Sequence, residues 1–224
     1  MNAKNKEFEN ITNDVNMVSE IIFQQMNLID DYLSNVNNSD SETVNELLSN
    51  ESKIDDYEKL IYDKIVNCIV LYNPLAGELR QLMASLRITT NLERIGDLCI
   101  NIIESLESTN KKIIGEKIKT LFVDMLKFAT LMVRNSMSSF ICCDMDLAEK
   151  VLNDDDVIDN LNEKINNLLS EFKHNEAYSS KEELTNLLSF NYINMNIERI
   201  ADNATNIAEA SIYMMQGEDI RHTN

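Results

Sequence analysis

The sequence has few of the residues from which tight turns are built: its 224 positions include only four glycines and one proline. Sandwiches, barrels and doubly wound sheets need many such turns, so this scarcity argues against them and favours long helices joined by few connections. Hydrophobic residues still make up 44% of the chain, which is enough for a buried core. We therefore expect an all-α protein.

Positive charge is also scarce, with 20 Lys and Arg against 38 Asp and Glu and a net charge of −18. Proteins bind nucleic acid through stripes of Lys and Arg, so this balance argues against a nucleic-acid partner. An excess of acid is suited instead to cations or to basic protein surfaces.

Long hydrophobic runs are missing as well. No stretch reaches the length of about 18 apolar residues that a membrane-spanning helix needs, and the opening MNAKNKEFEN lacks the hydrophobic segment of a signal peptide. We expect a cytoplasmic location without membrane insertion. The four cysteines show neither CxxC nor a Cys/His spacing suited to zinc, and we interpret them as small reduced hydrophobic residues.

What the chain does contain is helical periodicity. Apolar residues recur every three or four positions and predict six helices, at 5–36, 41–71, 76–108, 112–142, 145–174 and 181–216. The breaks have the chemistry of helix ends: Asn73-Pro74 separates two helices, and serines that can cap a helix lie in 37–41 and 175–183. Long helices with short links pack as antiparallel bundles.

One segment occurs twice in the chain. NLERIGDLCINIIES at 91–105 and NIERIADNATNIAEA at 196–210 agree at eight positions, most of them polar. A weaker pair, 50–61 and 154–165, aligns at an offset of 104. Each half of the chain therefore contains three helices, of which the second and third contain the matching segments.

The repeat predicts the domain organisation. We expect two three-helix bundles in tandem, the first formed by residues 1–110 and the second by residues 111–224. A single six-helix array is the alternative.

The shared polar residues lie on one face of each helix. At about 100° per residue, Glu93 and Asp97 fall on the face opposite Ile95, and the second copy repeats the pattern with Glu198 and Asp202. These carboxylates are therefore expected outside the core. On a single amphipathic helix, such a stripe is most often simply solvated.

The acidic spacing, however, recurs. An acidic residue followed four positions later by Asp occurs twice in each half, at Glu51 and Asp55, Glu93 and Asp97, Asp155 and Asp159, and Glu198 and Asp202. Like charges at this helical spacing repel by a few tenths of a kcal/mol per pair. Where two such helices meet, four carboxylates converge, and a bound cation is the simplest compensation. We therefore predict one metal cluster in each half, with these eight residues as ligands.

The ligand type restricts the metal. Oxygen ligands without Cys or His favour hard ions such as Mg²⁺, Mn²⁺, Ca²⁺ or ferric iron, and they accept Zn²⁺ without selecting it. Asn101 and Asn206 lie one turn beyond each motif and either add an amide oxygen or are ordinary surface amides. Arg94 and Arg199 either balance spare negative charge or form ordinary exposed salt bridges.

The run NPLAGELRQLMASLRITTNLERIGDLCINIIE at 73–104, together with NIERIADNATNIAEA, resembles the PhoU family of phosphate-uptake regulators. The resemblance spans nearly the whole chain and implies two three-helix bundles related by an internal repeat. It also implies surface metal clusters bound by an E/D-x-x-x-D motif, which the four acidic pairs match. The halves are not interchangeable, because Thr185 and Tyr192 occupy the positions equivalent to Arg80 and Arg87.

The resemblance implies regulation and no catalysis. PhoU-like proteins act in the cytoplasm beside a phosphate ABC transporter and a sensor histidine kinase, and they hold the phosphate-starvation response off when phosphate is plentiful. The implied partners are the transporter's ATPase subunit and the kinase, and a homodimer is a further possibility. The sequence contains no P-loop, no Gly-rich phosphate cradle and no nucleophile paired with a base.

Three alternatives compete with this interpretation. A ferritin-like di-metal oxidase needs Glu-x-x-His on two helices, whereas Glu171 and His174 form the one match in the sequence. A helical bundle without a metal would leave the four acidic motifs unexplained. An accessory protein of a different phosphate transporter can share the same ancestry, and neighbouring genes would separate it from a PhoU-like regulator.

Overall fold

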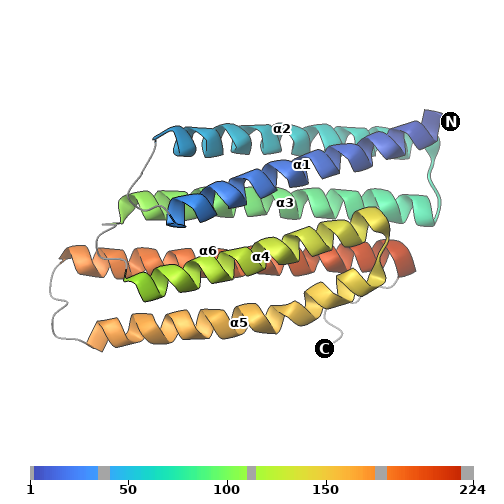
Figure 1. The fold of residues 1–224 in the computed structure, drawn as a ribbon. Helices are drawn as coiled ribbons and strands as arrows, with labels where there is room; N and C mark the ends of the chain where they lie inside the picture. Colours follow the sequence, from blue (N-terminus) through green and yellow to red (C-terminus); the bar gives the residue numbers. More distant parts are fainter. Residues whose placement is uncertain (1–2, 35–40, 110–114, 175–180, 218–224) are drawn as a thin grey trace.

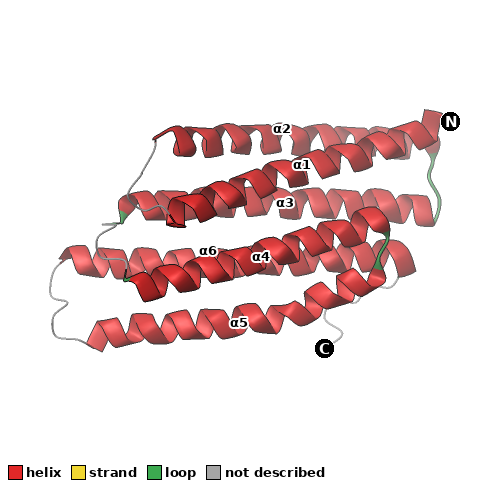
Figure 2. Ribbon diagram, in the orientation of Figure 1, coloured by secondary structure: helices red, strands yellow, loops and turns green. Residues whose placement is uncertain are grey.

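A computed structural model describes residues 3–34, 41–109, 115–174 and 181–217. Within these residues the chain forms six helices, shown in Figures 1 and 2: α1 (Ala3–Ser34), α2 (Ser41–Tyr72), α3 (Gly77–Ser108), α4 (Glu116–Cys142), α5 (Met145–His174) and α6 (Lys181–Gln216). All six predicted helices are confirmed, and wherever the chain is described their bounds agree to within two residues. The predicted ends at 35–36 and 112–114 lie outside the described residues.

The helices form two three-helix bundles that lie lengthwise against each other (Figure 1). Helices α1 to α3 make the first bundle and α4 to α6 the second; α3 packs along α6, and α1 packs against α4. The predicted fold class is confirmed. The predicted division between residues 110 and 111 falls within 110–114, which lies outside the described residues, and it stays a prediction.

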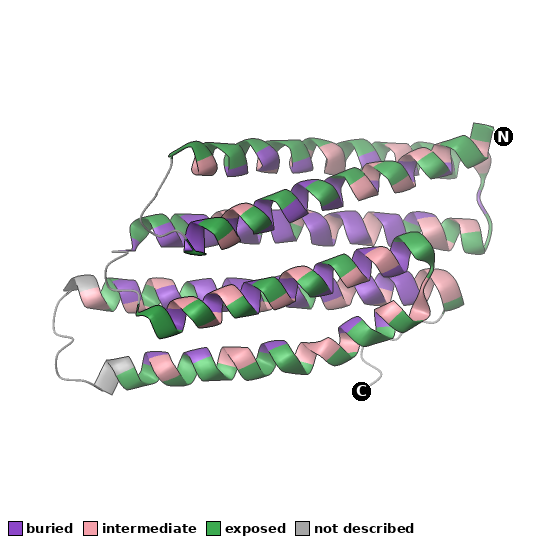
Figure 3. Ribbon diagram, in the orientation of Figure 1, coloured by how far each residue is buried: buried purple, intermediate pink, exposed green. Residues whose placement is uncertain are grey.

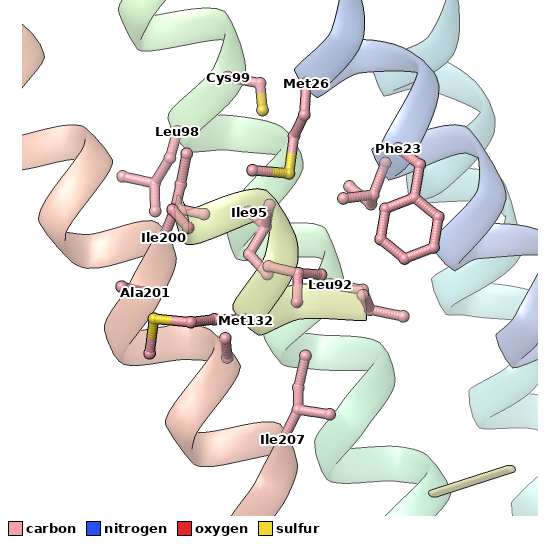
Figure 4. Packing of buried hydrophobic residues seen from close by; sticks show 14 of the residues in the cluster. Phe23, Met26, Leu92, Ile95, Leu98, Cys99, Met132, Ile200, Ala201 and Ile207 are labelled. Carbon is pink, nitrogen blue, oxygen red and sulfur yellow. The ribbon is translucent and has the colours of Figure 1, made fainter. Parts of the chain in front are cut away.

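The core follows from where each helix lies. Helix α3 contacts α1 and α2 as well as α6, and accordingly it buries apolar residues along much of its length, whereas the outer helix α2 buries a single stripe (Figure 3). The buried side chains of both bundles form one continuous hydrophobic cluster, in which Leu98 of α3 lies beside Ile200 of α6 (Figure 4). Burial on this scale is the dominant stabilising contribution to the fold.

Two of the connections are tight turns. In the α2–α3 turn, Asn73 and Ala76 adopt positive φ angles of 43° and 44° on either side of Pro74, and the predicted break at Asn73-Pro74 is confirmed. In the α4–α5 turn, Cys143 adopts the left-handed conformation with φ 52°, and the carboxylate of Asp144 accepts a hydrogen bond of 3.1 Å from the backbone N–H of Leu147. Asp144 thereby caps α5.

The cysteines only partly match the prediction. All four are free thiols, and Cys68 and Cys99 are buried among apolar side chains as expected. Cys142 and Cys143 are exposed at the end of α4, so the interpretation as small hydrophobic residues fits Cys68 and Cys99 better than these two. None of the helices within the described ranges has the length and apolar character needed to cross a bilayer.

Candidate functional site

The four carboxylates predicted for the first half come together between α2 and α3. Glu51 and Asp55 lie one turn apart on α2, and Glu93 and Asp97 lie one turn apart on α3. The two helices are antiparallel neighbours, so each acidic pair faces the other. Asp97 raises the pKa of Glu51 across this boundary, and Asp55 raises the pKa of Glu93. We call this group the first cluster.

Burial dominates the electrostatics of the first cluster. Removal from water raises the pKa of Glu51 from its ordinary 4.5 to about 7, and the charges of Asp97 and Asp55 add to the effect. Glu93 also has a raised pKa, mainly through burial and then through the charge of Asp97. A hydrogen bond from Gln25 opposes the shift at Glu51. Ionising these two glutamates in the first cluster therefore costs more free energy than ionising them in water.

Gly96 makes the close approach of Glu51 to α3 possible. A Cβ atom at this position would lie 2.6 Å from Oε2 of Glu51 and 3.1 Å from Cδ1 of Ile54, which is closer than such atoms approach. Glycine in the middle of a helix costs about 1 kcal/mol relative to alanine. This glycine lowers the intrinsic helix stability of α3, and Glu51 occupies the space that a larger side chain would fill.

A fifth carboxylate, Glu58, belongs to the first cluster and was missed in the sequence. Glu58 raises the pKa of Glu93 and accepts a hydrogen bond of 3.3 Å from the hydroxyl of Thr90. It also borders an open groove of about 670 Å³ that continues along α2 and α3 past Tyr62 and Leu86. Glu58 does not belong to a pair of acidic residues four positions apart, which was the predicted pattern. Its spacing of three residues from Asp55 is the signal that would have placed it on the same helix face.

The second cluster lies between α5 and α6 and is built in the same way. Asp155 and Asp159 come from α5, and Glu198 and Asp202 come from α6. Burial is the main cause of the raised pKa values of Asp155, Glu198 and Asp202, and Asp159 raises all three further by its charge. The structure thus brings together the four predicted residues of this half. Of the neighbouring aspartates, Asp156 is exposed.

The second cluster differs from the first at the position equivalent to Glu58, which is Asn162. A hydrogen bond from Asn162 lowers the pKa of Glu198. The oxygen of Asn162 accepts hydrogen bonds from Asn194, at 2.5 Å, and from Asn166, at 2.9 Å. At this position the first cluster therefore has a further carboxylate, whereas the second cluster has hydrogen-bonded neutral amides.

The arginines beside the motifs act through charge. Arg94 lowers the pKa of Glu93, and Arg199 lowers the pKa of Asp202. Both arginines are exposed, and neither forms an ion pair with any carboxylate in the part of the chain that the structure describes. This arrangement fits charge balance better than the alternative of ordinary salt bridges. Asn101 and Asn206 are half-buried, and their role as ligands stays a prediction.

The donor atoms fit a hard metal ion. Each cluster presents oxygen atoms only, and Oε1 of Glu51 is a buried oxygen without a hydrogen-bond partner. Over the described ranges, no three His, Cys, Asp or Glu side chains converge closely enough to hold an ion in this conformation. To hold an ion, the carboxylates, which repel one another, would have to rotate inward about their side-chain bonds.

Comparison with known proteins identifies both halves of the chain. The sequence model of the PhoU domain matches residues 11–106 and again residues 122–211. The Phosphate-specific transport system accessory protein PhoU homolog 1 of Thermotoga maritima is 30% identical over 205 residues, covering 91% of this chain and 86% of the relative. The accessory protein PhoU of Serratia marcescens is 27% identical over 97% of this chain and 86% of its own length.

Solved structures agree on the fold. The crystal structure of PhoU from Pseudomonas aeruginosa superimposes with a TM-score of 0.86 at 21% identity, over 96% of this chain and 99% of that one. The phosphate transport system regulatory protein PhoU from Streptococcus pneumoniae gives a TM-score of 0.83 at 18% identity, over 96% and 98% of the two chains. At this level of identity the likeness concerns the fold alone.

Proposed function

Because the chain belongs to the PhoU family, we propose that it is a metal-binding negative regulator of phosphate uptake and of phosphate-starvation signalling. Its relatives are named as accessory proteins of phosphate-specific transport systems, which supports a role beside such a transporter. The observation that carries the proposal is the convergence of the acidic motifs into one cluster per half. The protein acts without catalysis, as an adaptor in the cytoplasm.

The eight predicted carboxylates are the residues that would hold the metal. In the first half they are Glu51, Asp55, Glu93 and Asp97, and in the second half Asp155, Asp159, Glu198 and Asp202. A bound ion of the Mg, Mn, Fe or Zn class supplies positive charge to these oxygens. Burial and mutual repulsion raise the pKa values of Glu51, Glu93, Asp155, Glu198 and Asp202, and these are the effects that such an ion offsets.

The proposed partners are the ATPase subunit of a phosphate ABC transporter and a sensor histidine kinase. A chain with a net charge of −18 repels an acidic partner, most of all where four carboxylates lie together. When the clusters are neutralised, the same surfaces no longer oppose docking, and complementary contacts can form. Metal occupancy would in this way control which proteins approach the bundle.

A double substitution tests the metal site. Changing Glu93 and Asp97 to Ala should remove metal from the first half and leave the second half loaded, with helix content nearly unchanged because Ala favours helix. Glu42 and Glu46 have the same spacing on an exposed face of α2, so their double Ala variant is the matched control. Metal content of the purified proteins is the measurement. Equal content in the two variants would exclude the first cluster as a site.

Gene deletion tests the regulatory role. Loss of the protein should switch on phosphate-scavenging genes in phosphate-rich medium, measured as transcript levels. The tagged protein should also co-purify with the transporter's ATPase subunit or with the kinase. A deletion strain that represses normally, together with no such partner in the purified material, would contradict the proposed regulation while leaving the metal sites unaffected.

A further inference from the structure

Gln25 of α1 is a polar residue buried at the inner end of the first cluster. Its side chain is 0% exposed, and its Nε2 donates hydrogen bonds to the carbonyl oxygen of Leu47, at 3.2 Å, and to Oε2 of Glu51, at 3.4 Å. Its own oxygen, Oε1, has no hydrogen-bond partner. Gln25 therefore lies against the cluster with an unused acceptor.

The unused acceptor faces the space beside Gly96. Oε1 of Gln25 lies 3.5 Å from the point that a Cβ of residue 96 would occupy, and Oε2 of Glu51 lies 2.6 Å from the same point. The other carboxylate oxygen of Glu51 is also buried and without a partner. Buried oxygens are nearly always paired, so two unpaired ones in one place indicate a group that is bound there in function.

The chemistry of these atoms narrows that group to a cation. When Glu51 is ionised, its two carboxylate oxygens and the amide oxygen of Gln25 are all acceptors, and Asp97, which contacts Glu51 from α3, adds more. A hard divalent ion satisfies several such oxygens at once, and amide oxygens are regular ligands of these ions.

We infer that Gln25 is an additional metal ligand, which makes the first metal site an inner site built from three helices. Gln25 contributes from α1, Glu51 from α2 and Asp97 from α3. The ion it takes is a hard divalent cation of the Mn²⁺ class, bound with part of its water shell removed. This inference rests on the proposed metal-binding function. It adds that the first half binds the metal ion more tightly than the second half does.

The second half lacks the corresponding features. Alanine occupies position 201, equivalent to Gly96, and the groups that shift the pKa values of Asp155, Glu198 and Asp202 all belong to α5 and α6. Buried oxygens without a partner also occur here, on Asp154 of α5 and on Asn194 and Asn196 of α6, but all three belong to the two helices of the cluster, and none comes from α4. The second site is therefore a two-helix site, with weaker binding than the first.

The test is a Gln25→Met variant of the full chain, prepared in a background in which Asp155→Asn and Asp202→Asn disable the second site. Gln24→Met is the matched control, because Gln24 is the exposed neighbour on the same helix. Binding of Mn²⁺ alone is followed by calorimetry and by electron paramagnetic resonance. Gln25→Met should weaken binding about 10- to 100-fold, the range found when residues that support a metal site are removed. Gln24→Met should leave it unchanged.

The melting temperature of the metal-free protein separates a ligand from a structural residue. Met has nearly the volume of Gln and the substitution removes an unpaired buried oxygen, but it also removes the hydrogen bonds from Nε2 to Leu47 and Glu51, so the metal-free Tm of Gln25→Met should fall modestly while the protein stays folded. If Gln25→Met unfolds the metal-free protein at the temperature of the titration, Gln25 is a structural residue and the inference is overturned. A Gln25→Met protein that binds Mn²⁺ as tightly as Gln24→Met overturns it as well.

Gly96→Ala provides a second variant, since it displaces the flexible end of Glu51 while favouring the helix. It should weaken the first site, and Ala201→Gly in the otherwise intact protein should leave the first site unchanged. If the unmodified chain binds no Mn²⁺ in either half, the proposed metal function fails together with this inference. Binding in both halves with no effect of Gln25→Met or Gly96→Ala removes this inference alone.

Discussion

Glu51 is the side chain in which burial, charge and hydrogen bonding act together most strongly. It lies half-buried against α3, beside Asp97 and below Gln25, and its pKa is raised to about 7. The folded, metal-free protein therefore binds a proton at Glu51 more tightly than the unfolded chain does. This difference links the stability of the fold to pH.

The first prediction concerns that link. Between the ordinary pKa of 4.5 and the folded value of about 7, the folded state holds more protons than the unfolded state, so stability falls as pH rises through this window. In the presence of a chelator, Tm should therefore increase as the pH is lowered from about 7.5 to about 5.5. Thermal unfolding at a series of pH values is the measurement.

Glu51→Gln should reduce this pH dependence, because the neutral amide cannot titrate. Glu42→Gln, on an exposed part of the same helix, should retain it. A Tm that falls on acidification from neutral pH in the metal-free protein would contradict the assigned role of Glu51.

The acidic ligand candidates could be predicted from the sequence, but their neighbour Gln25 and the raised pKa of Glu51 could not. The spacing of Glu93 and Asp97 repeats along the chain and is visible without coordinates. Gln25 lies on another helix and reaches Glu51 only through packing between helices, which no local pattern encodes. The raised pKa of Glu51 is also a product of burial, so reference values near 4 misplace its titration.

At the scale of helices and turns, the end of α4 contains an unfavourable residue. Cys143 has φ 52° and ψ 47°, the left-handed conformation that costs an L-residue with a side chain about 1–2 kcal/mol. Helices commonly end with glycine at this position, because glycine lacks the Cβ that causes the cost. The apolar periodicity that located the helices says nothing about this angle, so the strain was not predictable.

The second prediction follows from that conformation. Cys143→Gly should stabilise the protein by about 1 kcal/mol, since the gain at φ 52° exceeds the greater freedom of glycine in the unfolded chain. The adjacent Cys142→Gly is the control: Cys142 ends α4 in helical conformation, so glycine there should destabilise by up to about 1 kcal/mol. Denaturant titration of both variants measures the difference. Equal effects would show that the turn is not strained.

At the scale of the whole molecule, the hydrophobic core and the two clusters lie on different sides of the same helices. In α3, Ile95 and Cys99 are fully buried, whereas Asp97 between them is exposed. Helix α6 has the same separation of buried apolar residues from acidic residues. Both bundles therefore share one hydrophobic core, and the carboxylates lie on the outer faces of the helices. The repeated periodicity predicted this division correctly, because helix geometry alone determines which residues share a face.

The third prediction is that metal removal leaves the fold intact. Treatment with a chelator should leave the helical circular dichroism spectrum unchanged, because most of the hydrophobic core lies on helix faces away from the clusters. Tm should fall only by the amount expected from loss of a ligand that binds the folded state. A cooperative loss of helix on chelation would show instead that the ions are structural.

The difference between Glu51 with Gly96 and Asp155 with Ala201 has a consequence for how the two repeats diverged. From the first pair to the second, the acid loses one methylene group and the facing helix gains one methyl group, so the combined volume is nearly constant. Two changes that compensate in this way are coupled, and a double-mutant cycle measures the coupling. Glu51→Asp and Gly96→Ala together should therefore cost less metal affinity than the sum of the single variants. The double variant gives the first cluster the side-chain lengths of the second at these two positions.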